Sequence, residues 1–156
     1  AGDARRRWPS ERWARVAEHL HQKHRLSLVL TGRGDEASAV AELQARCRAP
    51  TLNLAGRLDL GAMAALLRGA ALMVTNDTGP AHMAFALDVP SVVIYWCGNL
   101  ITAGPMQRRR HRPVLSWTLA CPRCHATGRC GCDESWVAGA TLDEVIAQAD
   151  DLLAGE

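Results

Sequence analysis

Residues 71–96, "ALMVTNDTGPAHMAFALDVPSVVIYW", decide the fold of this chain. The apolar run at 71–76 predicts a buried strand, "PAHMAFAL" at 80–87 a short helix, and "PSVVIYW" at 90–96 a second strand. Two such strands joined by a helix form a parallel βαβ unit. The polar break between the first strand and the helix therefore lies at the carboxyl edge of a sheet, where ligands of such folds bind.

The same alternation of strands and helices extends on both sides of this unit. It predicts an α/β fold with one parallel sheet and helices on both faces. The predicted helices are 8–24, 35–47 (with Asp35 as N-cap), 59–70 and 141–153; the strands are 26–31, 51–56 and 113–117; and 97–112 is a loop. Thr141 and Glu144 form a capping box for the last helix.

Length and composition limit the functional classes. The 156 residues suit one domain with a substantial core, and 48% are hydrophobic. The formal net charge of +2 argues against a nucleic-acid partner. No apolar run is long enough for a transmembrane segment, and the basic start of the chain does not resemble a secretory signal. Because the sequence does not begin with Met, we expect a partner domain to be missing from it.

The break at 77–82 has the residues of an anion site. Gly79 allows a ligand to approach the backbone, and Pro80 suits the first turn of a helix, whose N–H groups favour a pyrophosphate. Thr78 adds a hydroxyl, and His82 lies in the same turn. Asp77 repels phosphate, so it suits sugar hydroxyls or helix capping. An alternative is that Asp77 and Thr78 only cap the helix, with turn chemistry from Gly79 and Pro80.

A cysteine cluster, "CPRCHATGRCGC", occupies 121–132 within an insert at about 118–135. Its spacing, C-x2-C-x5-C-x-C, begins with the pair typical of zinc sites and ends with an unusual pair. A structural zinc site, disulfides, free thiols and an iron–sulfur cluster all remain open. The candidate metal ligands are Cys121, Cys124, Cys130 and Cys132.

"TGRGDEA" at 31–37 has the form of a dinucleotide-binding loop. The acid that should follow the next strand is missing, which argues against a nicotinamide cofactor. The glycines are better explained as a tight turn that places Asp35 or Glu36 near a ligand. Three arginines in "ARRRWP" (4–9) can bind phosphate, although charge alone favours a solvated basic terminus.

These segments together resemble the family 9 glycosyltransferases, the bacterial heptosyltransferases of lipopolysaccharide core synthesis. The resemblance is strongest in "VTNDTGPAHMAFALDVPSVVIYW" and extends to "ARRRWPSERWARVAEHL" and "LAGRLDLGAMAALLRGA". It implies the C-terminal half of a GT-B fold, a Rossmann-like domain that binds a nucleotide sugar of the ADP-heptose type. Where the family often reads "FGPT", this chain reads "YWCGN" at 95–99.

The resemblance also implies roles for single residues. Thr78 and Gly79 contact the diphosphate, Asp77 the donor sugar, and His82 the phosphate end. The remaining matches are Arg6 for the diphosphate, Glu36 for the ribose, and Leu58 and Leu60 for the adenine.

The reaction implied is a direct, inverting sugar transfer that needs no metal. Its catalytic base and its lipid-linked or lipopolysaccharide-core acceptor belong to the missing N-terminal domain, so the chain alone is expected to be inactive. The full-length protein would be cytoplasmic, peripheral to the inner membrane. Two alternatives are a GT-B-like sugar-nucleotide epimerase and a non-enzymatic interaction module that carries zinc.

Overall fold

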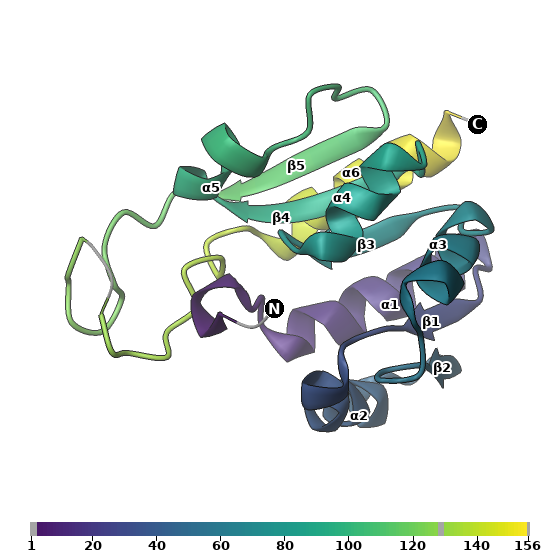
Figure 1. Ribbon diagram of the computed structural model, residues 1–156, viewed down its shortest axis with the longest axis horizontal. Coiled ribbons are helices and arrows are strands. Elements are labelled where there is room, and N and C mark those ends of the chain that lie inside the picture. Colours follow the sequence, from purple (N-terminus) through teal and green to yellow (C-terminus); the bar gives the residue numbers. More distant parts are fainter. Residues whose placement is uncertain (1–2, 128–129, 156) are drawn as a thin grey trace. The chain divides into compact units, whose positions relative to one another are not determined.

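The computed structural model describes residues 3–127 and 130–155. The chain divides into two compact units (Figure 1). One is Pro9–Ala65, and the other joins the start of the chain, up to Trp8, to the part from Leu66 onward. We describe each unit by itself and call them the Pro9–Ala65 unit and the Asp77 unit.

The Pro9–Ala65 unit contains two helices and two short parallel strands. Its elements are α1 (Ser10–His24), β1 (Leu28–Leu30), the 3-10 turn η2 (Gly34–Glu36), α2 (Ala37–Arg46) and β2 (Thr51–Asn53). β1 pairs with β2 from Leu28–Thr51 to Leu30–Asn53. The prediction that Asp35 caps the second helix is wrong, because η2 comes first and Glu36 is the N-cap of α2. α3 (Leu60–Arg68) follows β2 and runs past the end of this unit.

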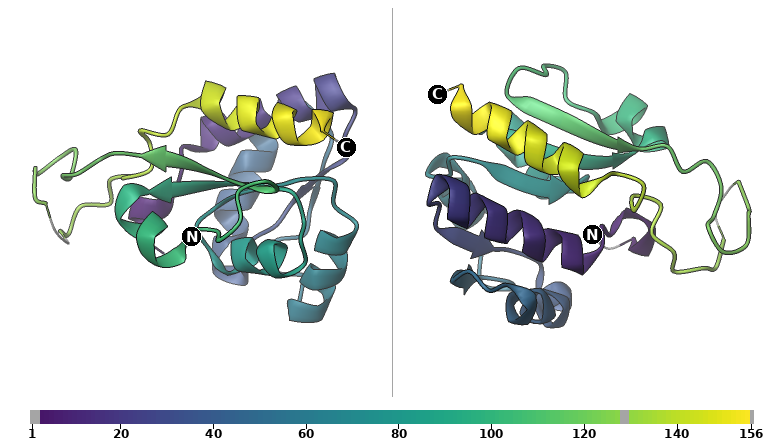
Figure 2. Two further views of the ribbon diagram at one scale, coloured as in Figure 1. Left: turned by 90° about the horizontal axis from the view of Figure 1, so that it is seen from above. Right: turned by 180° about the vertical axis from the view of Figure 1, so that it is seen from behind.

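The Asp77 unit is built on three parallel strands in the order β3-β4-β5. These are β3 (Met73–Asn76), β4 (Ser91–Trp96) and β5 (His111–Ser116). α4 (Gly79–Ala86) and α5 (Cys97–Ala103) lie on one face, and α6 (Leu142–Ala154) covers the other (Figure 2). The short turn η1 (Ala4–Arg6) also belongs to this unit. The predicted capping box of the last helix is confirmed, since the Glu144 N–H donates to the Thr141 hydroxyl.

β4 is the centre of the core. Its residues Ser91 to Tyr95 are all buried, as expected for a middle strand covered on both faces. Ala81 of α4 packs on Val93 and Tyr95, and the small alanine side chain lets the helix approach the sheet closely. The continuous apolar run of β4 thus fixes the sheet from which the polar residues project.

All strand pairings between described residues are parallel, as predicted. They nevertheless form two hydrogen-bonded sets, β1 with β2 and β3-β4-β5, where the sequence predicts one sheet. The pattern of alternating strands and helices cannot distinguish these arrangements, because it reports strand direction and order along the chain rather than which strands pair.

The prediction of a loop at 97–112 is wrong over its first half, which forms α5. Leu100 and Ala103 pack against the core at Tyr95. The Tyr95 hydroxyl also donates to the Ala103 carbonyl at 2.9 Å, which holds the helix end. Gly98 lies in the first turn of this short helix and Gly104 is its C-cap, so its sequence has the composition of a turn.

Among the described residues, none of the helices combines the length and the apolar character needed to cross a lipid bilayer.

The buried His111 makes stability dependent on pH. Its Nδ1 lies 3.0 Å from the Ser91 hydroxyl, and burial lowers its pKa more than the nearby Asp88 raises it. The unfolded chain therefore takes up a proton at higher pH than the folded chain does. We expect the free energy of unfolding to be highest above about pH 6.5 and to fall as the pH decreases.

Urea unfolding of the wild type and of His111→Gln at about pH 7.5 and about pH 5.5 measures this loss. The loss between the two pH values should be smaller in the variant. An equal loss in both proteins would assign the pH dependence to other groups.

Candidate functional site

The carboxyl ends of β3, β4 and β5 gather the polar residues of the Asp77 unit. Asp77 and Thr78 follow β3 directly, and Asn99 lies in the first turns of α5 after β4. In parallel sheets this edge is the usual position of a ligand. The sequence-based prediction of a polar junction here is confirmed in its position, between β3 and α4.

Asp77 is the centre of the group, because its carboxylate is only 4% exposed yet has polar neighbours. The Asn99 side-chain amide donates to Oδ2 at 2.8 Å, and the Arg6 guanidinium lies 3.4 Å from the same oxygen. The His82 Nε2 lies 3.8 Å from Oδ1. Burying a carboxylate without such polar partners costs free energy. Three segments far apart in the sequence therefore meet at one side chain.

Thr78 and Gly79 form the start of α4. Thr78 is the N-cap, but its hydroxyl donates to the Asn76 carbonyl at 3.2 Å and makes no capping bond to the helix. Gly79 is the first helical residue, and a Cβ added there would meet no atom within 4 Å. Packing within the chain therefore does not require a glycine at this position. The early N–H groups of a helix lack intrahelical partners and present partial positive charge.

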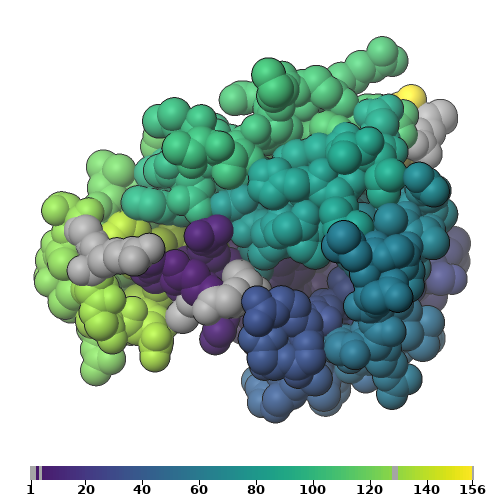
Figure 3. Space-filling model, viewed as in Figure 1, coloured from purple at the N-terminus to yellow at the C-terminus, as the bar shows by residue number. Residues whose placement is uncertain are grey.

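The segment before Trp8 brings Arg6 to Asp77 and is anchored at several points. The Arg5 guanidinium binds Asp3, and its hydrogen bond lowers the pKa of Asp3 to about 2. The Arg5 carbonyl accepts from the Trp136 backbone N–H at 2.8 Å. The indole N–H of Trp8 donates to the Ala140 carbonyl at 2.9 Å. Figure 3 shows this purple segment lying against the yellow-green residues that precede α6.

A cavity of about 220 Å³ opens beside Asp77. Arg6 and Asn99, which bind the carboxylate, both line it. The complete lining is Asp3, Arg5, Arg6, Trp96, Asn99, Thr127 and Trp136. Its two arginines and two indole rings provide cationic groups beside flat apolar surfaces, a combination that suits an anionic ligand with a ring.

Asn99 is the residue that sequence reasoning missed. The sequence predicts a loop for the segment that contains Asn99. Asn99 also belongs to the "YWCGN" stretch at 95–99, where this chain departs from the family pattern described above. The sequence does contain one signal for Asn99. It is a polar residue shortly after an apolar strand, and such positions lie at the edge of a parallel sheet where ligands bind.

The other three predicted contact residues belong to the Pro9–Ala65 unit. Glu36 lies in η2 after β1, where its carboxylate accepts from the Arg33 N–H at 2.9 Å. Leu58 and Leu60 follow β2, and Leu60 is 76% exposed. The loops after the two strands are in contact, because the Gly56 N–H donates to the Gly32 carbonyl at 2.9 Å. Gly56 has a φ of 71°, a conformation that favours glycine.

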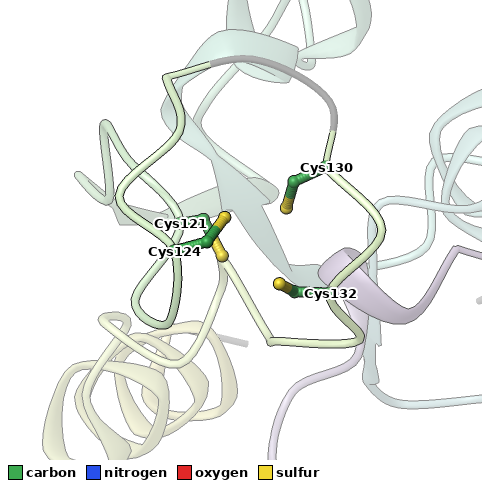
Figure 4. A group of neighbouring side chains, drawn as sticks. All are labelled: Cys121, Cys124, Cys130 and Cys132. Carbon is green, nitrogen blue, oxygen red and sulfur yellow. The ribbon is translucent and has the colours of Figure 1, made fainter.

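The four cysteines of the insert come together. Their sulfur atoms all lie within 4.8 Å of one another, and they point toward a common centre (Figure 4). Backbone N–H groups of Cys124 and Arg123 bind the Cys121 sulfur and help lower its pKa to about 7. All six cysteines lie in the part of the chain that the structure describes, and none of them forms a disulfide there. The arrangement can bind a metal ion.

Comparison with known proteins identifies relatives. The family model "Glycosyltransferase family 9 (heptosyltransferase)" matches residues 1–128. The lipopolysaccharide core heptosyltransferase OpsX of Haemophilus influenzae is 29% identical over 104 residues, which are 65% of this chain and 30% of that protein. The chain thus spans about a third of the length of this curated relative.

Two solved structures share the fold. A family 9 glycosyl transferase from Veillonella parvula superposes with a TM-score of 0.82 at 22% identity, over 100% of this chain and 44% of that one. The ADP-heptose lps heptosyltransferase II of E. coli gives a TM-score of 0.80 at 22% identity, over 99% and 44%. The α/β fold with parallel strands therefore matches less than half of each of these proteins.

Proposed function

The chain belongs to glycosyltransferase family 9, the heptosyltransferase family, and we propose that it is the part that binds the nucleotide-sugar donor, of the ADP-heptose type. The observation that carries the proposal is the buried Asp77 carboxylate immediately before the N-terminus of α4. An acid would repel a phosphate placed there alone. A ligand that carries hydroxyls next to a diphosphate suits both the carboxylate, which accepts from the hydroxyls, and the helix N-terminus, which favours the diphosphate.

The contacts of Asp77 support the proposed division of roles. Asn99 and Arg6 share Oδ2, so Oδ1 keeps capacity to accept a sugar hydroxyl. The diphosphate lies at Thr78 and Gly79, where the helix N–H groups and the missing Cβ allow close approach. His82, exposed at the same turn, supports the phosphate end.

Arg6 is suited to move between two partners. Its distance of 3.4 Å from Asp77 is long for a charge-assisted bond, and its side chain is 42% exposed. In the proposed complex it turns to the diphosphate and stabilises the negative charge that develops on the leaving group. The arginine and the helix dipole then replace a metal ion in this step.

The remaining contacts and the acceptor complete the proposal. Glu36 binds the ribose, and Leu58 and Leu60 contact the adenine. Transfer is direct and inverting, with a carboxylate base and a lipopolysaccharide-core acceptor on a domain outside this sequence. The full-length enzyme acts in the cytoplasm at the inner membrane.

An NMR titration with ADP and with ADP-heptose tests the proposal. We expect amide signals of Asp77, Thr78, Gly79 and His82 to shift with either ligand. No shift at millimolar concentrations would refute nucleotide binding by this chain.

Gly79→Ala sharpens the same test. An alanine at the first position of α4 meets open space, so the free energy of unfolding should change by less than about 1 kcal/mol. Because the added methyl group occupies the position proposed for the diphosphate, ADP affinity should fall about tenfold, or about 1.4 kcal/mol. The matched control is Gly69→Ala, whose added methyl group makes only an ordinary contact with the Leu66 carbonyl at 3.7 Å and lies outside the proposed site. Unchanged affinity in Gly79→Ala would place the diphosphate elsewhere.

A further inference from the structure

The connection from β5 to α6 is unusually long for a segment without regular structure. Between Ser116 and Leu142 the described residues form no helix or strand. Loops longer than about 12–15 residues without secondary structure are uncommon in compact domains. Such a segment needs some other source of order.

Hydrogen bonds anchor the two ends of this connection. The indole N–H of Trp96 donates to the Thr118 carbonyl at 2.7 Å, and the Ser116 hydroxyl donates to the Trp136 carbonyl at 2.6 Å. The rings of Trp96 and Trp136 meet edge to face at 5.1 Å. The four clustered cysteines lie between these anchors, in the part of the loop that the sheet does not organise.

The first two cysteines lie in a tight turn. The Cys121 N–H donates to the Ala126 carbonyl at 2.8 Å, and the His125 N–H donates to the Cys121 carbonyl at 2.9 Å. His125 has a φ of 59°, which reverses the chain direction. Cys121 is fully buried although it belongs to a loop. The turn therefore points two sulfurs to the same side, where Cys130 and Cys132 face them (Figure 4).

We propose that Cys121, Cys124, Cys130 and Cys132 bind one zinc ion as a closed, structural tetrathiolate site. With a Zn–S bond of about 2.3 Å, a tetrahedral ion holds its sulfurs about 3.8 Å apart. The sulfurs here lie within 4.8 Å of one another, so small side-chain rotations complete the geometry. Binding deprotonates the thiols, and their protons pass to solvent.

The geometry distinguishes zinc from the other possibilities. Disulfides would join the sulfurs in pairs, whereas all four face one point. In a four-iron cluster each thiolate binds a different iron, which spreads the sulfurs farther apart than a single ion does. Four protein ligands also leave no open position, so the ion serves structure rather than catalysis.

The zinc site stabilises one wall of the cavity beside Asp77. Thr127, from the loop between the second and third cysteines, lines the cavity, and Trp136 binds the Arg5 carbonyl. The site thus supports the segment that carries Arg6. This inference does not depend on the proposed function, because its test requires no nucleotide.

Metal analysis of the purified protein, unchanged and after Cys124→Ser, tests the proposal. We expect about one zinc ion per wild-type chain and less than about a tenth of that in the variant. Cobalt(II) added to the metal-free protein should give the intense absorption bands of a tetrahedral tetrathiolate complex. The matched control is Cys47→Ser, which removes a free, half-buried thiol outside the cluster and should keep the full zinc content.

Several results would overturn the proposal. They are a wild-type protein that takes up neither zinc nor cobalt, iron in place of zinc, or a thiol titration that shows disulfides among the four cysteines. Full zinc retention in Cys124→Ser would also overturn it. Because the cobalt spectrum is measured on the unchanged protein, the test remains decisive even where a variant does not fold.

Discussion

Asp77→Asn is expected to weaken binding of ADP-heptose about 100-fold, or about 3 kcal/mol, the cost of replacing a buried, hydrogen-bonded carboxylate by a neutral group with one acceptor fewer. Asparagine keeps the size of the side chain but replaces one carboxylate oxygen by an N–H donor. Asn99 donates to Oδ2 and the sugar hydroxyl is proposed to donate to Oδ1, so an amide, which has a single acceptor oxygen, cannot accept at both positions. Isothermal titration calorimetry with the sugar nucleotide measures the loss.

ADP is the control ligand for this variant, because ADP lacks the sugar that Asp77 is proposed to bind. The affinity for ADP should change by less than about tenfold. Asp88→Asn is the matched variant, since the Asp88 side chain is exposed and its partners are Arg110, Gln107 and His111 rather than residues of the site, so both affinities should stay unchanged. Equal losses for ADP and ADP-heptose in Asp77→Asn would mean that Asp77 maintains the site rather than recognising the sugar.

Trp136→Ala is expected to lower the free energy of unfolding by about 3–5 kcal/mol, as large-to-small changes of buried aromatic residues do. Trp136 is 2% exposed and packs against Trp96. For a chain of this length the melting temperature should fall by about 6–20 °C. Thermal unfolding followed by circular dichroism measures the change.

Trp117→Ala is the control for this change. Trp117 is 73% exposed, so its removal should alter the free energy of unfolding by less than about 0.5 kcal/mol. If Trp136→Ala and Trp117→Ala lowered the free energy of unfolding by similar amounts, the assignment of Trp136 to the core would be contradicted.

The sequence predicted the elements of the Asp77 unit where local pattern determines them. Apolar runs predict the strands β3 and β4. A glycine and a proline at the start of α4 predict the polar break at Asp77 between them. The capping box of α6 is equally local. Each of these features depends on residues only a few positions apart.

What the sequence could not predict depends on residues that meet in space. Arg6 and Asp77 are 71 positions apart, and only the folded structure brings the guanidinium to the carboxylate. Asn99 was missed because α5 is short and contains glycine, and it is held by packing on Tyr95 rather than by its own helix pattern. The roles of Glu36, Leu58 and Leu60 stay predictions.

The anchoring of the segment before Trp8 has a consequence for biosynthesis. Trp8 donates to the Ala140 carbonyl, 132 positions later, and the Arg5 carbonyl accepts from the Trp136 N–H. A nascent chain emerging from the ribosome therefore carries Arg6 long before it contains the residues that hold Arg6 in place. The pairing of Arg6 with Asp77 in this arrangement can form only after Ala140 has left the exit tunnel, and such sequence-distant contacts slow folding.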